Sequence, residues 1–200
     1  ANLDHYGGLI DVARAMPIGQ VLLGEAFHHD AARGLARKLL ADLAGLNVPV
    51  GTVVQGDKIG GFDPISVDVV WPPAQFAARD ANDASVVVRI SHSGRSMLLT
   101  GDIARFGQGR LSRERPQDVL ADVLLVPHHG SQVTLDPQFI PAVNPHLAIV
   151  STKDSRRTAQ LAQVSPRECM VLDTWCCGMI TVDLLPEGPS AAPFRPSAYP

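Results

Sequence analysis

The sequence predicts an α/β protein in which layers of β-sheet are covered by helices. Short apolar stretches typical of buried strands alternate loosely with stretches of helical periodicity, and Gly- or Pro-containing turns separate them. The chain has 200 residues, of which 46% are hydrophobic, so one domain with a sizeable core can form. No apolar run reaches the roughly 18 residues that a membrane span needs.

In the first half of the chain, two helices and two strands are expected. The expected elements are a loop over residues 4–8, a helix over 9–15, a strand over 20–23, a helix over 30–44 and a strand over 50–54. Leu35, Leu39 and Leu43 fall on one face of the longer helix, which Asp30 is expected to cap. His28-His29 are interpreted as an exposed loop pair before that helix.

The second half is richer in strands. Strands are expected over residues 67–71, 85–90, 96–99, 123–126, 147–151, 169–172 and 179–185, and helical segments over 103–121, 137–143 and 158–164. Ser93-Gly94 predicts a hairpin turn. Cys176 and Cys177 are adjacent, so a bridge between them is disfavoured and they are interpreted as small buried residues on a strand.

The charge and the chain ends limit the classes of function. The formal net charge is −3, so no global basic field attracts nucleic acid or acidic lipid, although a local patch or a bound cation could replace it. Residues 1–185 are predicted to form the domain, and residues 186–200, with five prolines, a Pro-rich tail. The chain opens inside a polar motif, so we expect the protein to extend upstream. No feature indicates an oligomer.

Two glycine-flanked fragments place carboxylates where a metal site needs them. Asp4-His5 precedes two glycines that permit a tight turn, and Asp102 directly follows a buried-strand pattern and a glycine. Together they offer oxygen and imidazole ligands of the kind that zinc hydrolases use. The alternatives are an Asp-His pair that caps a helix and a Gly-Asp surface turn.

A pair of adjacent histidines supplies the third fragment. His128 and His129 follow an apolar strand, and neighbouring side chains there point to opposite faces, so one is expected to bind the metal. The other could donate a hydrogen bond to substrate or protonate a leaving group. The alternative is two histidines packed in a polar loop. His92 and His146 are interpreted as solvated or structural.

The order and spacing of these fragments resemble the metallo-β-lactamase superfamily, and within it the C-terminal hydrolase domain of ComEC-type competence proteins and their free-standing relatives. The resemblance covers about residues 1–185. The matching segments are Asp4–Gly8, Val69–Pro73, Asn82–Ile90, Leu98–Asp102 and Val126–Ser131.

This resemblance implies an αββα sandwich, lacking its N-terminal strands in this chain, with one or two Zn²⁺ ions at the edge between its sheets. Asp4 and His5 match the last two positions of the family's leading motif, in which Asn2 replaces a His or Asp. Asp102 matches the acidic residue that bridges two metals. His128 and His129 match the paired histidines, at least one of which is expected at the metal.

Two positions depart from the family pattern. Asn82 lies near a position where many members carry another histidine, and the segment Ser151–Thr158 lacks the late histidine that related proteins often have. The expected metal ligands are therefore Asp4, His5, Asp102 and one or both of His128 and His129, with a position left for water.

The resulting functional hypothesis is a zinc-dependent hydrolase, a phosphodiesterase or nuclease related to DNA uptake. In this hypothesis Asp4 orients the metal or the attacking water, Asp102 holds the metal, and the second histidine assists the leaving group. If a membrane channel lies upstream, the substrate is DNA and the domain faces the extracytoplasmic side; otherwise a cytoplasmic location is expected. The alternatives are a degenerate, non-catalytic sandwich that binds a ligand or partner, and a free-standing hydrolase of small esters.

Overall fold

A six-stranded mixed sheet forms the centre of the computed structural model, which describes residues 3–30, 34–166 and 168–194. In spatial order its strands are β3 (Ser66–Trp71), β4 (Val87–His92), β5 (Arg95–Leu99), β6 (Val123–Leu125), β7 (Leu147–Val150) and β8 (Met170–Asp173). Strands β3 to β5 are antiparallel, and β5 to β8 are parallel. The carboxyl ends of β5, β6 and β7 therefore meet at one edge of the sheet.

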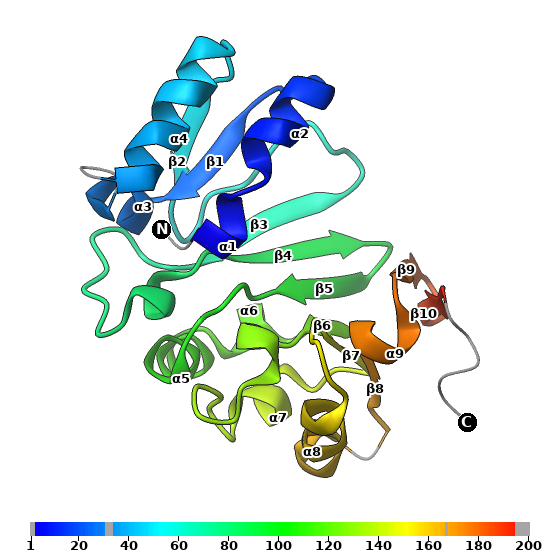
Figure 1. Ribbon diagram of the computed structural model, residues 1–200. Helices are drawn as coiled ribbons and strands as arrows, with labels where there is room; N and C mark the ends of the chain where they lie inside the picture. Colours follow the sequence, from blue (N-terminus) through cyan, green and yellow to red (C-terminus); the bar gives the residue numbers. More distant parts are fainter. Residues whose placement is uncertain (1–2, 31–33, 167, 195–200) are drawn as a thin grey trace.

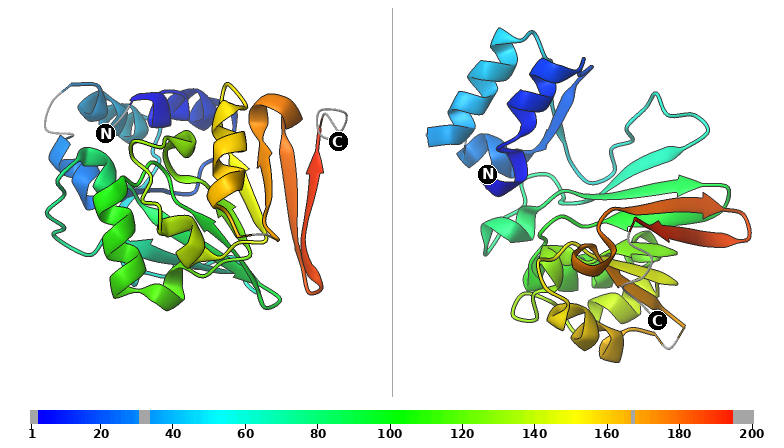
Figure 2. Two further views of the ribbon diagram at one scale, coloured as in Figure 1. Left: turned by 90° about the horizontal axis from the view of Figure 1, so that it is seen from below. Right: turned by 45° about the vertical axis from the view of Figure 1, so that its right-hand side comes forward.

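Helices cover one face of this sheet (Figure 1 and the left view of Figure 2). They are α5 (Arg105–Glu114), α6 (Pro116–Val119), α7 (Phe139–Val143) and α8 (Arg156–Val164). The main core lies between these helices and the sheet, where Trp71, Leu98 and Phe139 are fully buried. The apolar runs of β6 and β7 fit this position because both of their faces are covered.

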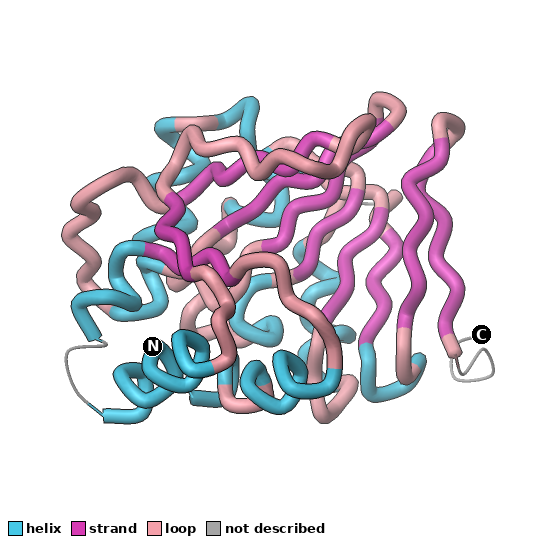
Figure 3. The backbone as a smooth tube through the Cα atoms, turned by 90° about the horizontal axis from the view of Figure 1, so that it is seen from above, coloured by secondary structure: helices cyan, strands magenta, loops and turns pink. Residues whose placement is uncertain are grey.

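Two smaller sheets lie on the opposite face of the large sheet. One pairs β1 (Val21–Gly24) with β2 (Val50–Val53) in parallel and carries α2 (Leu9–Ala15) and α4 (Gly34–Gly45) on its outer side. The other is the antiparallel hairpin of β9 (Ile180–Leu185) and β10 (Gly188–Pro193), which Figure 3 shows beside the C-terminus. The layers therefore run helix, sheet, sheet, helix, and the predicted α/β class is confirmed.

The hairpin between β4 and β5 is also confirmed. Ser93 and Gly94 form its two-residue turn with φ values of 50° and 76°. Positive φ at both central residues is what a turn matching the twist of the flanking strands requires.

The structure corrects the expected local structure near the N-terminus. Residues 4–8 do not form only a loop, because α1 (Leu3–Tyr6) is a helical turn closed by a bond from the Gly7 N–H to the Leu3 carbonyl. The expected helix over 30–44 is α4 alone, and His28 lies in a separate helix, α3 (Glu25–Asp30), with Asp30 as its last residue. Residues 31–33 lie outside the described part of the chain.

Two further corrections concern the C-terminal region. Cys176 and Cys177 lie in α9 (Thr174–Cys177) instead of a strand, because the Asp173 carboxylate accepts from the Cys176 N–H and starts a helical turn. Residues 188–193 belong to β10, although a tail was expected there, since β9 provides a partner strand. Pro189 and Pro193 are tolerated because β10 is an edge strand. No helix of the described residues is long and apolar enough to cross a bilayer.

Candidate metal centre

Asp102 and His129 meet at the edge where the parallel strands end. Asp102 follows β5, and His129 lies in η2 (Pro127–Gly130), the short helical turn after β6. The two strands are in register, with Leu99 paired to Leu125, so the residues that follow them emerge side by side. Asp102 is only 8% exposed, so its carboxylate is fixed in the wall of the site.

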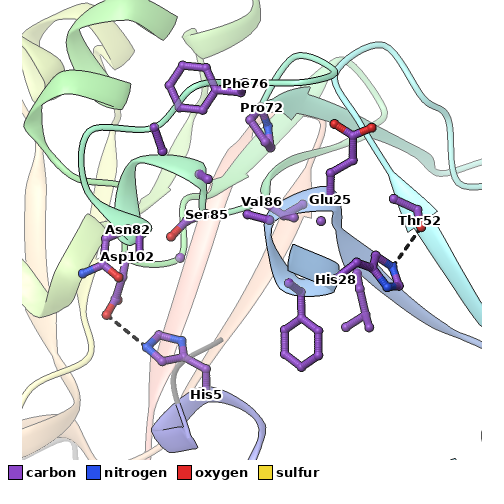
Figure 4. A pocket seen from close by; sticks show the side chains of 18 of the residues that line it. His5, Glu25, His28, Thr52, Pro72, Phe76, Asn82, Ser85, Val86 and Asp102 are labelled. Carbon is purple, nitrogen blue, oxygen red and sulfur yellow. Dashed lines mark hydrogen bonds and ion pairs between the residues drawn. The ribbon is translucent and has the colours of Figure 1, made fainter. Parts of the chain in front are cut away.

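His5 completes a group of three possible metal ligands. Its Nε2 lies 3.0 Å from Asp102 Oδ2, as the dashed line in Figure 4 marks. The His129 Nε2 lies 3.9 Å from Asp102 Oδ1, and one ligand atom from each of the three residues lies within 4.8 Å of the other two. A tetrahedral zinc ion with bonds of about 2.0–2.2 Å separates its ligand atoms by roughly 3.3 Å, so this set fits one such ion with small adjustments.

The backbone after β7 orients the His129 ring. Its Nδ1 lies 2.9 Å from the carbonyl oxygen of Ser151. A carbonyl can only accept, so Nδ1 carries a hydrogen, and Nε2, which lies on the side of Asp102, is the ring nitrogen left to bind a metal. Metal-binding histidines usually have this arrangement, in which a carbonyl or carboxylate fixes the tautomer and the ring orientation.

The turn that carries the histidines has an unusual backbone. His128, His129 and Gly130 have φ values of 49°, 55° and 71°, three successive residues in the left-handed region. The turn is held by a bond from the His128 N–H to the Gly101 carbonyl at 3.2 Å and by Arg157, whose Nη1 donates to the His129 carbonyl at 2.9 Å. Strained conformations of non-glycine residues persist where the surroundings enforce them, often at functional sites.

His128 lies outside the three-ligand group. Its Nδ1 lies 3.5 Å from Asn82 Nδ2, and its ring is nearly perpendicular to that of His129. Asn82 lies in η1 (Ala81–Ala84), a turn fixed by a capping box between Asp80 and Asp83. Asn82, which lies near a position where many members of the resembled family carry a histidine, is thus beside His128.

A large cavity of about 1190 Å³ opens beside the group. His5 and Asp102 form part of its wall, together with residues of α3, β1 and the segment 72–86 (Figure 4). His28 also lines this cavity, but its Nε2 bonds to Thr52 Oγ1 at 2.9 Å, and it is not in the ligand group.

The structure thus brings together three of the five predicted site residues, His5, Asp102 and His129, and places His128 outside this group. The side chain of Asp4 and the whole of Asn2 lie outside the described part of the structure. Sequence reasoning missed Ser151 and Arg157 as supports of His129. A backbone carbonyl leaves no signal in a sequence, and Arg157 looks like any exposed arginine on a helix.

The layer order and the His/Asp group at the sheet edge define an α/β domain with a candidate metal centre where its parallel strands end. No family model matches the chain. ComE operon protein 3 of Bacillus subtilis is 27% identical over 157 residues, 78% of this chain and 20% of that protein. Competence protein ComA of Neisseria gonorrhoeae is 31% identical over 149 residues, 74% of this chain and 18% of that protein.

A solved structure is also similar to this chain. It is described as a Zn-dependent hydrolase of the metallo-β-lactamase superfamily from Thermotoga maritima, with a TM-score of 0.42, 15% identity and coverage of 79% of this chain and 84% of that one. The chain spans about a fifth of the length of its curated relatives. The similarity to these two competence proteins agrees with the resemblance drawn from the motifs.

Proposed function

We propose that this chain is a zinc-dependent hydrolase of phosphodiesters. The observation that carries the proposal is the group of His5, Asp102 and His129, whose ligand atoms lie within 4.8 Å of one another beside a large cavity. Three protein ligands leave one position of a tetrahedral ion open, as catalytic zinc sites require. When bound, such an ion supplies Lewis-acid activation of water near neutral pH.

The protein residues then have separate tasks. The Asp102 carboxylate offsets the charge of the cation, and the hydrogen bond to Ser151 keeps the His129 Nε2 available as a ligand. His128 is half-buried in the same turn but outside the ligand group, so we assign it the proton transfer to the leaving group.

The proposed substrate is a nucleic acid strand. Two relatives bear names of the competence machinery, and the resemblance to that family implies DNA uptake. The net charge of −3 gives no long-range attraction, so binding relies on the metal and on local cations. An upstream membrane channel, with this domain on its extracytoplasmic side, belongs to the same proposal.

The second candidate is a non-catalytic domain that binds a ligand or partner. It is favoured by the Ser151–Thr158 segment, which contributes a backbone carbonyl to the site where a further histidine was expected. A hydrolase of small esters is the third candidate, since the cavity also admits small substrates.

Hydrolysis of bis(p-nitrophenyl) phosphate and of a short oligonucleotide by the zinc-loaded chain separates these candidates, because a hydrolase of small esters cleaves only the first. We expect the wild type to cleave both substrates. His128→Gln should lose at least about 100-fold in kcat/KM on the oligonucleotide, because its alkoxide leaving group needs a proton that p-nitrophenolate does not need. His28→Ala is the matched control, because His28 lines the cavity outside the ligand group. If the chain binds zinc but cleaves neither this ester nor oligonucleotides, the second candidate, a non-catalytic binding domain, would be favoured over a hydrolase.

A further inference from the structure

The cavity beside the ligand group carries a second feature suited to an anionic substrate. Arg79 and Phe76 line the same cavity as His5 and Asp102. Figure 4 shows Phe76 on the wall beyond Asn82 as seen from the ligand group. Because Arg79 lines the cavity that reaches the ligand group, a substrate that fills this cavity can contact its side chain.

A ladder of aromatic rings supports Arg79. Its guanidinium carbon lies 4.1 Å from the ring centroid of Phe106, and Phe106 stacks on Phe76 with an interplanar angle of 19°. Phe76 in turn contacts the edge of Trp71 at 4.6 Å between centroids, and Trp71 is fully buried in the main core. Stacking of this kind orients a guanidinium and leaves the N–H groups in its plane free to bind a ligand.

Arg79 is also uncommitted. Within the described part of the chain its guanidinium makes no hydrogen bond or ion pair, and it is the one lysine or arginine in the cavity wall. Arg110, whose guanidinium carbon lies 5.5 Å from the ring centroid of Phe76, is by contrast neutralised by two hydrogen bonds to Glu114.

The acidic residues of the wall do not neutralise Arg79. Glu25 accepts from the Gln75 N–H at 2.6 Å, and Asp80 accepts from the Asn82 N–H at 2.8 Å. Asp102 belongs to the ligand group. The wall thus holds one carboxylate in the ligand group and a guanidinium that pairs with none of the acidic residues named here.

We propose that Arg79, held by Phe106 and Phe76, binds a phosphate of the substrate strand other than the one at the ligand group. A planar guanidinium fork matches phosphate oxygens and forms charge-assisted hydrogen bonds with them. This inference rests on the proposed phosphodiesterase function. It assigns the substrate as a strand with at least two phosphates, and it assigns Arg79 as a specificity-determining residue.

Fluorescence anisotropy of a short fluorescein-labelled oligothymidylate, mixed with the zinc-loaded full chain, tests the inference. The oligonucleotide has a phosphorothioate backbone, which resists cleavage. We expect Arg79→Ala to weaken binding about tenfold, the effect of one charge-assisted contact. The slope of log K against log salt should fall by about 0.7, the value for one phosphate contact on a single strand. Arg113→Ala is the control, because Arg113 is an exposed arginine of α5 that does not line the cavity.

Phe106→Leu gives a second variant that keeps the charge and removes the stacking platform, and it should weaken binding several-fold with the salt slope unchanged. Equal binding by the Arg79→Ala and Arg113→Ala variants, or no binding by the wild type, would overturn the inference.

Failure of this inference can be distinguished from failure of the proposed function. Turnover of bis(p-nitrophenyl) phosphate tests the proposed function alone, because this ester has no second phosphate for Arg79 to bind. An Arg79→Ala chain that loses turnover of this small ester as well would also contradict a separate phosphate subsite.

Discussion

The left-handed backbone of His128 and His129 determines which imidazole can bind a metal ion. It turns His129 toward Asp102 and His128 toward Asn82. The adjacency of the two histidines predicts that only one of them faces the metal, but not which one. That choice depends on the Ser151 carbonyl and on Arg157, which lie 22 and 28 residues away in the chain.

Removal of the Arg157 side chain should weaken zinc binding without removing a ligand. Arg157→Ala deletes the hydrogen bond to the His129 carbonyl and frees the turn, so we expect roughly a tenfold to 100-fold loss of zinc affinity, as for other supports of metal ligands. Competition with a zinc-chelating dye measures it. Arg156→Ala is the control, since Arg156 contacts Asp154 at the surface. Equal zinc affinities of the two variants would show that Arg157 does not position His129.

Cys177 should react slowly with iodoacetamide in the folded protein. Burial raises the pKa of its thiol above the ordinary value of 9.0, so the reactive thiolate is scarce at pH 8. Burial also raises the pKa of Cys169. Mass spectrometry of alkylated peptides should show much slower labelling of Cys177 in buffer than in urea. Equal rates would place the thiol at the surface, against its full burial.

At the scale of elements, the contact between α5 and η1 positions Asn82 beside His128. The Gly107 N–H donates to Asp83 Oδ1 at 2.9 Å, and the Asp83 carbonyl accepts from Trp71 Nε1 at 2.7 Å. The strands of the sheet follow from the sequence because their apolar runs are long and bounded by turn residues. The short turns α1 and η2 do not follow from it, since tertiary contacts and not local propensity stabilise such four-residue helices.

Gly107→Ala should destabilise the protein by about 1–3 kcal/mol, the range for overpacking a tight contact. An added Cβ would lie 2.7 Å from the Asp83 carbonyl oxygen and 2.8 Å from Ile103. Gly45→Ala is the matched control, because nothing lies within 4 Å of its Cβ position at the end of α4. Urea unfolding measures both variants, and equal midpoints for them would contradict the tight packing of α5 on η1.

At the scale of the whole molecule, the ligand group joins two separately packed regions. His5 comes from α1, beside the cluster of Val21, Leu39 and Leu43, whereas Asp102 and His129 belong to the edge of the large sheet. The α/β class and its layers were predictable, because they follow from the alternation of apolar strands and helices. The contact between His5 and Asp102 could not be predicted from local patterns, since 97 residues separate the two in the chain.

Zinc should therefore stabilise the folded chain against heat. At a free concentration of about 100 times its Kd, a ligand that binds only the native state adds about 2.7 kcal/mol, which raises the Tm of a protein of this size by roughly 5–11 °C. Scanning calorimetry with zinc, and with EDTA as the control, measures the shift. An unchanged Tm at saturating zinc would mean that the ion does not link the two regions.

The zinc content of purified protein tests the central claim most directly. Asp102→Asn keeps the shape of the side chain and removes its charge, while His28→Ala changes a histidine of the same cavity wall outside the ligand group. We predict that elemental analysis finds bound zinc in the wild type and an equal amount in His28→Ala, and that Asp102→Asn loses it. Stoichiometric zinc in Asp102→Asn would contradict a metal centre at His5, Asp102 and His129.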